Sequence, residues 1–141
     1  MIDPSTVELT ATRTSDQKEL TLVMSDEFNE DNRSFKPSDD KLFTAIHQPG
    51  LTNEELQFYD SSYVTTRDGS LILKTTAEKT HWKEYDAATN VEHEMTRNYT
   101  SAMLQSWNQF CFTGGVLEMS IQLPGGSREG VGGMWPAAWC V

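Results

Sequence analysis

Two tryptophans four residues apart, Trp135 and Trp139, are the side chains of this sequence best suited to recognition chemistry. An indole has a flat apolar face that stacks on the C–H face of a sugar ring, while amides and carboxylates bind the sugar hydroxyls. A spacing of four is even, so both indoles lie on one face if the segment is a β-strand. With Asn53 and Glu55 they would suit a glycan-binding cleft. The alternative is that both tryptophans belong to the core.

The carboxylates form no recognisable catalytic pair. A retaining glycosidase holds two carboxyl groups about 5 Å apart across the scissile bond. Glu84-Tyr85-Asp86 comes nearest to such a strand, but no third acid follows it and the segment is not strand-like in sequence. Glu54 and Glu55 are adjacent and would point in opposite directions on an extended chain. We therefore assign no catalytic residue.

Motifs for other chemistries are missing. The three histidines (His47, His81 and His93) are scattered, without the spacing of a zinc-binding helix. The glycine-rich run from Gly125 to Gly133 lacks the Lys-Ser/Thr ending of a phosphate-binding loop. There is no Gly-x-Ser-x-Gly nucleophile elbow. We expect no metal and no cofactor, and we expect Asp26-Glu27 to make turn and loop hydrogen bonds.

Composition sets the size and the class of partner. The chain has 141 residues and a net charge of −10, which allows at most one domain and argues against nucleic acid or an anionic membrane as partner. No apolar run reaches the roughly 18 residues that span a bilayer, and the N-terminus does not resemble a signal peptide. We expect a flexible polar leader over residues 1–19 and part of one domain over residues 20–141.

Cysteines and sequons give weaker indications. Cys111 lies between two phenylalanines and is expected to be a buried thiol, while Cys140 could pair with it or stay free. The sequons Asn32-Arg33-Ser34 and Asn98-Tyr99-Thr100 permit a protein of the secretory pathway. In a chain of this length they can also arise by chance.

The elements that must position these residues are strands. Apolar residues alternate with polar ones over 116–123, where Leu117, Met119, Ile121 and Leu123 predict a half-buried antiparallel strand. Asp68-Gly69 predicts a tight hairpin turn. Residues 78–98 have no sustained period and are expected to form a long loop or insertion. The pattern favours an all-β sandwich or jelly roll, with further strands expected at 20–24, 43–47, 56–59, 63–66, 71–76 and 99–107.

Six blocks of sequence occur in an order that resembles glycoside hydrolase family sixteen, which contains laminarinases and related β-glucan-active enzymes. The stretch SAMLQSWNQFCFTGG is most similar to the branch of fungal-type β-1,6-glucan synthesis-associated proteins. The blocks are LVMSDEF (22–28), TNEELQFY (52–59), DGSLIL (68–73), YTSAMLQSW (99–107), FCFTGGVLEMSIQLPG (110–125) and GGMWPAAW (132–139).

The resemblance implies a concanavalin-like jelly roll with a concave glycan-binding face. It also implies a retaining mechanism with two glutamates, on a Glu-x-Asp strand that follows the Trp-Pro-Ala-x-Trp block. Because this sequence stops at Val141, we expect the sandwich to lack its C-terminal strands and the chain to lack its catalytic carboxylates. The resemblance places Trp135 and Trp139 at the glucan cleft and Asn53 near it.

The sequence departs from the wider family at one place. Ala102-Met103 stands where many of the hydrolases have Gly-Arg, and the branch itself tends to have Met there. The branch also implies the secretory pathway or cell surface, often with a membrane anchor. The expected function is therefore a β-glucan-active glycosidase or transglycosylase in cell-wall glucan biosynthesis or remodelling. The alternatives are a non-catalytic, lectin-like glucan-binding module and an inactive structural fragment.

Overall fold

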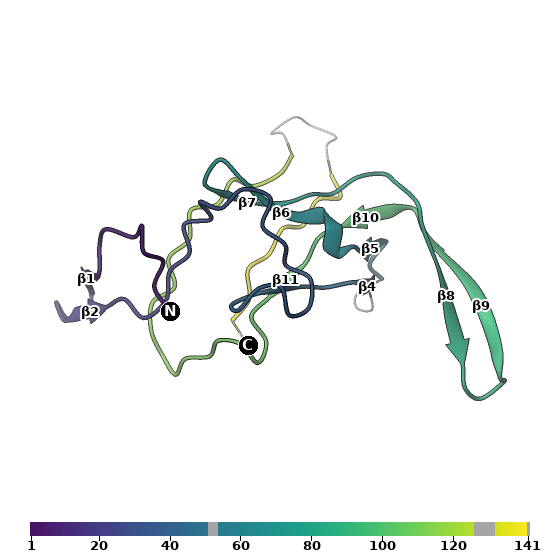
Figure 1. Cartoon of the computed structure of the whole chain (residues 1–141), viewed down its shortest axis with the longest axis horizontal. Coiled ribbons are helices and arrows are strands. Elements are labelled where there is room, and N and C mark those ends of the chain that lie inside the picture. Colours follow the sequence, from purple (N-terminus) through teal and green to yellow (C-terminus); the bar gives the residue numbers. More distant parts are fainter. Residues whose placement is uncertain (51–53, 126–131, 141) are drawn as a thin grey trace. The chain divides into compact units, whose positions relative to one another are not determined.

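The structure is a computed structural model that describes residues 1–50, 54–125 and 132–140 (Figure 1). It is all-β, as the sequence predicts, and its strands are short. Two units, Met1–Cys111 and Phe112–Val141, are described separately below. The elements are β1 (Thr10–Thr12), β2 (Glu19–Thr21), β3 (Thr44–Ala45), β4 (Gln48–Pro49), β5 (Gln57–Tyr59), a 3-10 turn (Ser61–Tyr63), β6 (Val64–Arg67), β7 (Ser70–Leu73), β8 (Thr80–Asp86), β9 (Val91–Arg97), β10 (Tyr99–Ser101) and β11 (Leu104–Gln105).

The strands of the first unit form small sheets. A three-stranded sheet has the order β10-β5-β4, in which β10 runs parallel to β5 and β4 runs antiparallel to it. The other pairs are all antiparallel: β1 with β2, β3 with β11, β6 with β7, and β8 with β9. The strands expected at 43–47, 56–59, 63–66 and 71–76 correspond to β3, β5, β6 and β7. The jelly roll itself stays a prediction.

The β6–β7 hairpin turns where the sequence predicts. Arg67 pairs with Ser70, so Asp68 and Gly69 are the two residues of the loop. Their φ angles are 52° and 68°, the left-handed values that a type I′ turn needs at both central positions. The Asp68 N–H donates to the Asp31 carboxylate at 2.9 Å, which ties the turn to the preceding loop.

The prediction of a loop over residues 78–98 was wrong. This segment contains the two longest strands, β8 and β9, paired over seven residues each from Thr80–Arg97 to Asp86–Val91 (Figure 1). Cross-strand pairs stabilise it, including the Lys83 Nζ–Glu92 Oε2 ion pair at 3.0 Å. Both faces of the hairpin carry polar side chains, so the apolar alternation by which a strand is recognised is missing.

The core of the first unit is small and aromatic. Phe35, Ala45 and Val64 are buried at its centre. Two polar side chains are equally withdrawn from water, Thr66 and Thr100. The Thr66 hydroxyl donates to the Glu30 carbonyl and accepts the Arg33 N–H at 2.9 Å, so its burial leaves no orphaned group. The partly buried residues packed against the centre are Phe28, Phe43, Leu71, Ala102 and Leu104.

An ion-pair network closes one side of this core. The Arg33 guanidinium bridges Asp26, with Nη1–Oδ2 at 2.8 Å, and Asp40, with Nε–Oδ2 at 2.6 Å. Its Cζ lies 4.9 Å from the centroid of the Phe35 ring. Asp26 also accepts the Phe28 N–H, the turn hydrogen bond that the sequence predicts for this residue.

The second unit differs from its prediction. No strand is formed at 112–125 or 132–140, and the alternating apolar residues of 116–123 are exposed. A strand exists only where its N–H and C=O groups pair with another strand, and the described residues provide no partner strand for this segment.

The prediction of a buried Cys111 was wrong. Cys111 is exposed because the flanking aromatic residues do not enclose it. Cys140 is also exposed, and both thiols are free.

Residues 1–19 hold regular contacts with the segment that follows them. β1 pairs with β2, and the amino group of Met1 donates to the Val23 carbonyl at 3.0 Å. Asp3 accepts the Glu27 N–H at 3.0 Å. The division into a leader and a domain stays a prediction.

Candidate glycan-binding site

One face of the β10-β5-β4 sheet carries polar and aromatic side chains together. Its register pairs Tyr99 with Gln57, Ser101 with Tyr59, and Gln48 with Tyr59. Paired residues of neighbouring strands project from the same face, so these five side chains share one surface, here called the tyrosine face. The opposite face of β5 carries Phe58, which is buried. The alternation Gln57-Phe58-Tyr59 therefore fixes which side of the sheet is turned outward.

Glu55 extends this polar surface at the start of β5. The Tyr59 hydroxyl donates to Glu55 Oε1 at 3.3 Å and accepts from Gln57 Nε2 at 2.8 Å. Burial raises the pKa of Tyr59, and the nearby Glu55 carboxylate adds to that effect by opposing a phenolate. The phenol is therefore neutral at physiological pH. Amide, carboxylate and phenol groups held in this way can exchange hydrogen bonds with sugar hydroxyls.

Gly50 sets the position of Glu55. The Gly50 N–H donates to the Gln57 carbonyl at 3.0 Å, which brings its backbone against the Glu55 side chain. A Cβ at Gly50 would lie 2.6 Å from the Glu55 Cβ. Only glycine permits this approach, so a glycine at position 50 is part of how the chain places the carboxylate.

The predicted site residues are distributed over both units. Glu55 lies in the first unit, in contact with Tyr59. Trp135 and Trp139 lie in the second unit and are 91% and 79% exposed. They are not on a strand, so the argument that places both indoles on one strand face does not apply. Asn53 lies outside the described residues. The grouping of these four residues into one cleft stays a prediction.

The sequence interpretation missed the tyrosine face. The sequence places Tyr59 and Tyr99 only in the strands expected at 56–59 and 99–107. The usable signal was the alternation around Phe58, which places Gln57 and Tyr59 on one side of β5. That Tyr99 lies beside Gln57 depends on the parallel pairing of β10 with β5, a long-range contact that local pattern does not give.

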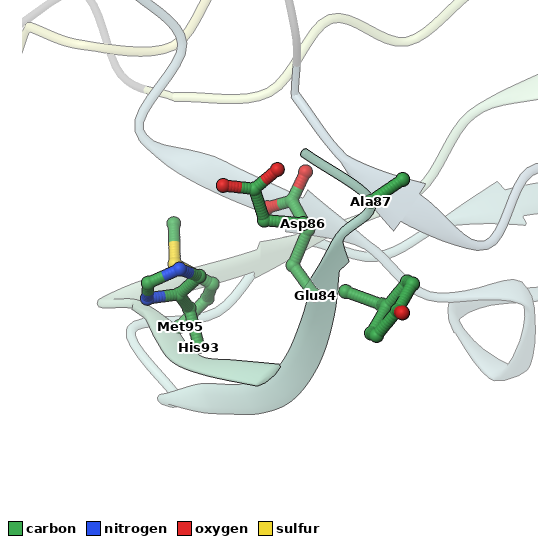
Figure 2. Close-up of a pocket in the computed structure, with 6 residues that line it drawn as sticks. Glu84, Asp86, Ala87, His93 and Met95 are labelled. Carbon is green, nitrogen blue, oxygen red and sulfur yellow. The ribbon is translucent and has the colours of Figure 1, made fainter. Parts of the chain in front are cut away.

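A polar pocket lies on the β8–β9 hairpin. It is a pocket of about 460 Å³ lined by Glu84, Asp86, Met95 and His93, together with Tyr85 and Ala87. Figure 2 shows the Glu84 and Asp86 carboxyl groups close together, with the His93 and Met95 side chains beside them on the neighbouring strand. Glu84 and Asp86 lie two residues apart on β8, and Glu84 is directly opposite His93 in the register of the two strands. These groups can bind hydroxyls; among the described residues no three His, Cys, Asp or Glu side chains form a group suited to a metal ion.

Aromatic contacts join the base of this hairpin to the three-stranded sheet. The Trp82 ring lies 5.1 Å from that of Phe58, and the His47 ring packs edge-on to Phe58 at 5.1 Å. His47 Nδ1 lies 3.6 Å from Asp60 Oδ1. Burial raises the pKa of Asp60, but hydrogen bonds from Ser62 and the nearby imidazole together hold it below its usual value. The contact at Phe58 therefore covers the inner side of the sheet and leaves its tyrosine face outward.

Comparison with known proteins identifies the family. The family described as beta-glucan synthesis-associated protein SKN1/KRE6/Sbg1 matches residues 1–141, the whole chain. The chain belongs to the SKN1/KRE6/Sbg1 family. The resemblance to the branch of β-glucan synthesis-associated proteins is thereby confirmed.

Individual members of the SKN1/KRE6/Sbg1 family align over the whole of this chain. It is 39% identical to the beta-glucan synthesis-associated protein SKN1 of Candida albicans and 38% identical to KRE6 of the same organism. It is 37% identical to SKN1 of Saccharomyces cerevisiae. The chain spans only 17%, 17% and 16% of the lengths of these relatives. No solved structure matches the chain. Within the described residues, no helix has the length and apolar character to cross a bilayer.

Proposed function

We propose that this chain acts in cell-wall β-glucan biosynthesis or remodelling, as part of a β-glucan-active glycosidase or transglycosylase. Membership of the SKN1/KRE6/Sbg1 family over all 141 residues is the observation that carries this proposal. The relatives are named for β-glucan synthesis, and we infer the identity of the polymer from these names. The expected location is the secretory pathway or the cell surface.

The contribution of residues 1–141 in this proposal is to bind glucan. Trp135 and Trp139 present exposed indoles, and the tyrosine face presents Tyr59 and Tyr99 beside amide and carboxylate groups. Stacking of a ring on the apolar side of a glucose unit, with polar groups at its edge, is the general design of a sugar site. The net charge of −10 does not oppose this, because a glucan is uncharged.

A non-catalytic, lectin-like module is the second candidate. It is favoured by the contacts of the two acids that flank β5, Glu55 and Asp60. Glu55 accepts a hydrogen bond from Tyr59, and Asp60 is held by Ser62 beside His47. Both acids already have structural partners. In this reading the chain holds the polymer and another protein or segment supplies the chemistry.

Isothermal titration with laminari-oligosaccharides and with β-1,6-linked gluco-oligosaccharides tests glucan binding. Trp135→Ala removes a stacking surface and is expected to raise the Kd about tenfold, equivalent to roughly 1.4 kcal/mol. Trp107→Ala is the matched control, because Trp107 is 65% exposed and lies outside the candidate site. Binding that Trp135→Ala and Trp107→Ala weaken equally would contradict a site at Trp135.

The tyrosine face is tested by its own pair of variants. Tyr99→Ala removes a ring that is 44% exposed and is expected to weaken binding, whereas Tyr99→Phe keeps the ring and is expected to bind as wild type. No heat from the wild-type chain with either oligosaccharide would overturn glucan binding as a whole. Release of labelled glucose or a transfer product by the same preparation would favour the enzyme over the module.

A further inference from the structure

We propose that Asn98 carries an N-linked glycan, and that the glycan is attached before strand β10 joins its sheet. This inference concerns a modification site and rests on the proposed secretory location only for its occurrence in the cell. Asn98 begins the sequon Asn98-Tyr99-Thr100.

Asn98 is placed where the folded chain can carry a bulky group. It is exposed, and the chain bends there between β9 and β10. The bend takes the chain from one sheet to another, because Arg97 pairs with Thr80 whereas Tyr99 pairs with Gln57. The side-chain amide of Asn98 makes no hydrogen bond with the described residues, so its replacement by a glycosylated amide breaks no contact there. A glycan needs this kind of surface position.

Thr100 has the opposite environment. It is 3% exposed, and its hydroxyl donates to the Glu78 carbonyl at 2.9 Å and lies 2.6 Å from the Thr80 hydroxyl. Its backbone is paired in both directions with Thr76, at 2.8 and 3.0 Å. Transfer of a glycan requires an enzyme to engage the hydroxyl of the sequon. In the folded chain that hydroxyl is buried and occupied, so the transfer has to precede the closure of this region.

The chemistry is a substitution at the anomeric carbon of a lipid-diphosphate-linked oligosaccharide. A bond forms between Asn98 Nδ2 and C1 of the first sugar, and the bond from C1 to the diphosphate oxygen breaks. The amide loses one proton, and the lipid diphosphate leaves with the bonding electrons. After folding, the Thr100 hydroxyl forms its hydrogen bonds with the Glu78 carbonyl and the Thr80 hydroxyl. Thr100 is therefore recognised first by the transferase and is buried afterwards.

The other sequon is less suited to a glycan. Asn32 lines a pocket of about 240 Å³ together with Tyr63 and Lys74, and its N–H donates to the Thr66 carbonyl at 2.8 Å. Because transfer precedes folding, this pocket does not bar modification of Asn32, but the folded chain would have to accommodate the sugar there. Asn32 therefore supplies a comparison within the chain.

The test is translation of the 141-residue chain, preceded by a cleavable secretion signal, in the presence of microsomes. The signal delivers the chain to the lumen whatever its native location. The expected result is a glycan that peptide N-glycosidase removes, with Asn98 converted to aspartate in the released peptide. Asn98→Gln is expected to abolish the mobility shift that this glycan causes. Asn32→Gln and Asn90→Gln, a surface turn residue outside any sequon, are expected to leave the modification of Asn98 unchanged.

The order of events is tested separately. Purified folded chain presented to solubilised transferase and lipid-linked donor is expected to remain unmodified, whereas the denatured chain is modified. Thr100→Ser is expected to keep the glycan, and Thr100→Val to lose it. An unmodified Asn98 in the microsomal assay would overturn the site, and equal modification of folded and denatured chain would overturn the order. Neither result affects glucan binding, which is measured on chain produced in bacteria without glycan.

Discussion

Arg33 donates from Nε to Asp40 Oδ2 at 2.6 Å, and both side chains are largely withdrawn from water, at 18% and 8% exposure. The other carboxylate oxygen of Asp40 accepts the N–H groups of Leu42 and Phe43, each at 2.8 Å. One carboxylate thus joins the loop at Arg33 to the segment that enters β3. Because a buried charge needs compensating partners, this pair decides whether the two segments stay together.

Asp40→Ala is expected to lower the free energy of unfolding by about 1.5–3 kcal/mol, the usual contribution of hydrogen bonds to a charged group. The variant removes three hydrogen bonds to the carboxylate and leaves the Arg33 charge with Asp26 alone. Denaturant unfolding measures the change. Asp39→Ala is the control, because Asp39 is exposed and, within the described part of the chain, its carboxylate accepts a hydrogen bond from the Ser34 hydroxyl alone. Equal losses in the two variants would contradict this role for Asp40.

The same carboxylate predicts an acid-sensitive fold. Burial raises the pKa of Asp40, but the Arg33 guanidinium and the Leu42 and Phe43 N–H groups together hold it below its usual value. A group whose pKa is lower in the folded state stabilises it above the unfolded-state pKa, which is about 3.9 for aspartate. This stabilisation is lost as the pH falls through the folded-state pKa. The difference in unfolding free energy between wild type and Asp40→Ala should therefore shrink below about pH 4.

The sequence predicts the elements that depend on neighbouring residues, such as the β6–β7 hairpin. The Asp68-Gly69 turn and the strands beside it follow from two residues that adopt positive φ and from the β-branched residues around them. The β8–β9 hairpin was missed because its pairs are mainly polar, for example Glu84 opposite His93. Residues 116–123 show the converse, since their alternation is ideal and yet they form no strand. In both segments, whether a strand forms depends on pairing with another strand, which the local sequence pattern does not show.

The candidate site also combines residues that the local sequence predicts with residues that are placed by long-range pairing. Glu55 is predicted as a site residue because a carboxylate can bind sugar hydroxyls, and the structure adds its contact with Tyr59. Trp135 is predicted for its indole, which is 91% exposed, and its role in recognition stays a prediction. Tyr99 reaches the tyrosine face only through a parallel pairing between residues more than forty positions apart. Contacts at that separation depend on the whole chain rather than on a local pattern.

Gly50→Ala is expected to disturb both stability and the position of Glu55. The added Cβ would lie 2.6 Å from the Glu55 Cβ and 3.1 Å from the Gln57 carbonyl oxygen, so Glu55 has to move. Overpacking of this kind costs about 1–3 kcal/mol. The measurements are denaturant unfolding and oligosaccharide titration. Gly115→Ala is the control, because its nearest contact is a Phe112 ring atom at 3.3 Å. Unchanged stability in Gly50→Ala would contradict the close approach.

The apolar residues of 116–123 predict self-association of the purified chain. Leu117, Met119 and Ile121 are 44%, 50% and 57% exposed and alternate with polar residues. Exposed apolar residues that recur along an unpaired segment favour contact with another chain. Ile121→Lys is expected to shift the mass measured by light scattering toward the monomer.

Gln122→Lys provides the matched control, since it adds the same charge at the neighbouring polar position. If the two lysine variants reduce association equally, the effect comes from placing a charged side chain in this segment and not from the loss of an apolar residue. A monodisperse wild-type monomer at high concentration would refute the prediction. The comparison therefore separates loss of hydrophobic contact along residues 116–123 from the local effect of an added charge, since both variants change the net charge of the chain from −10 to −9.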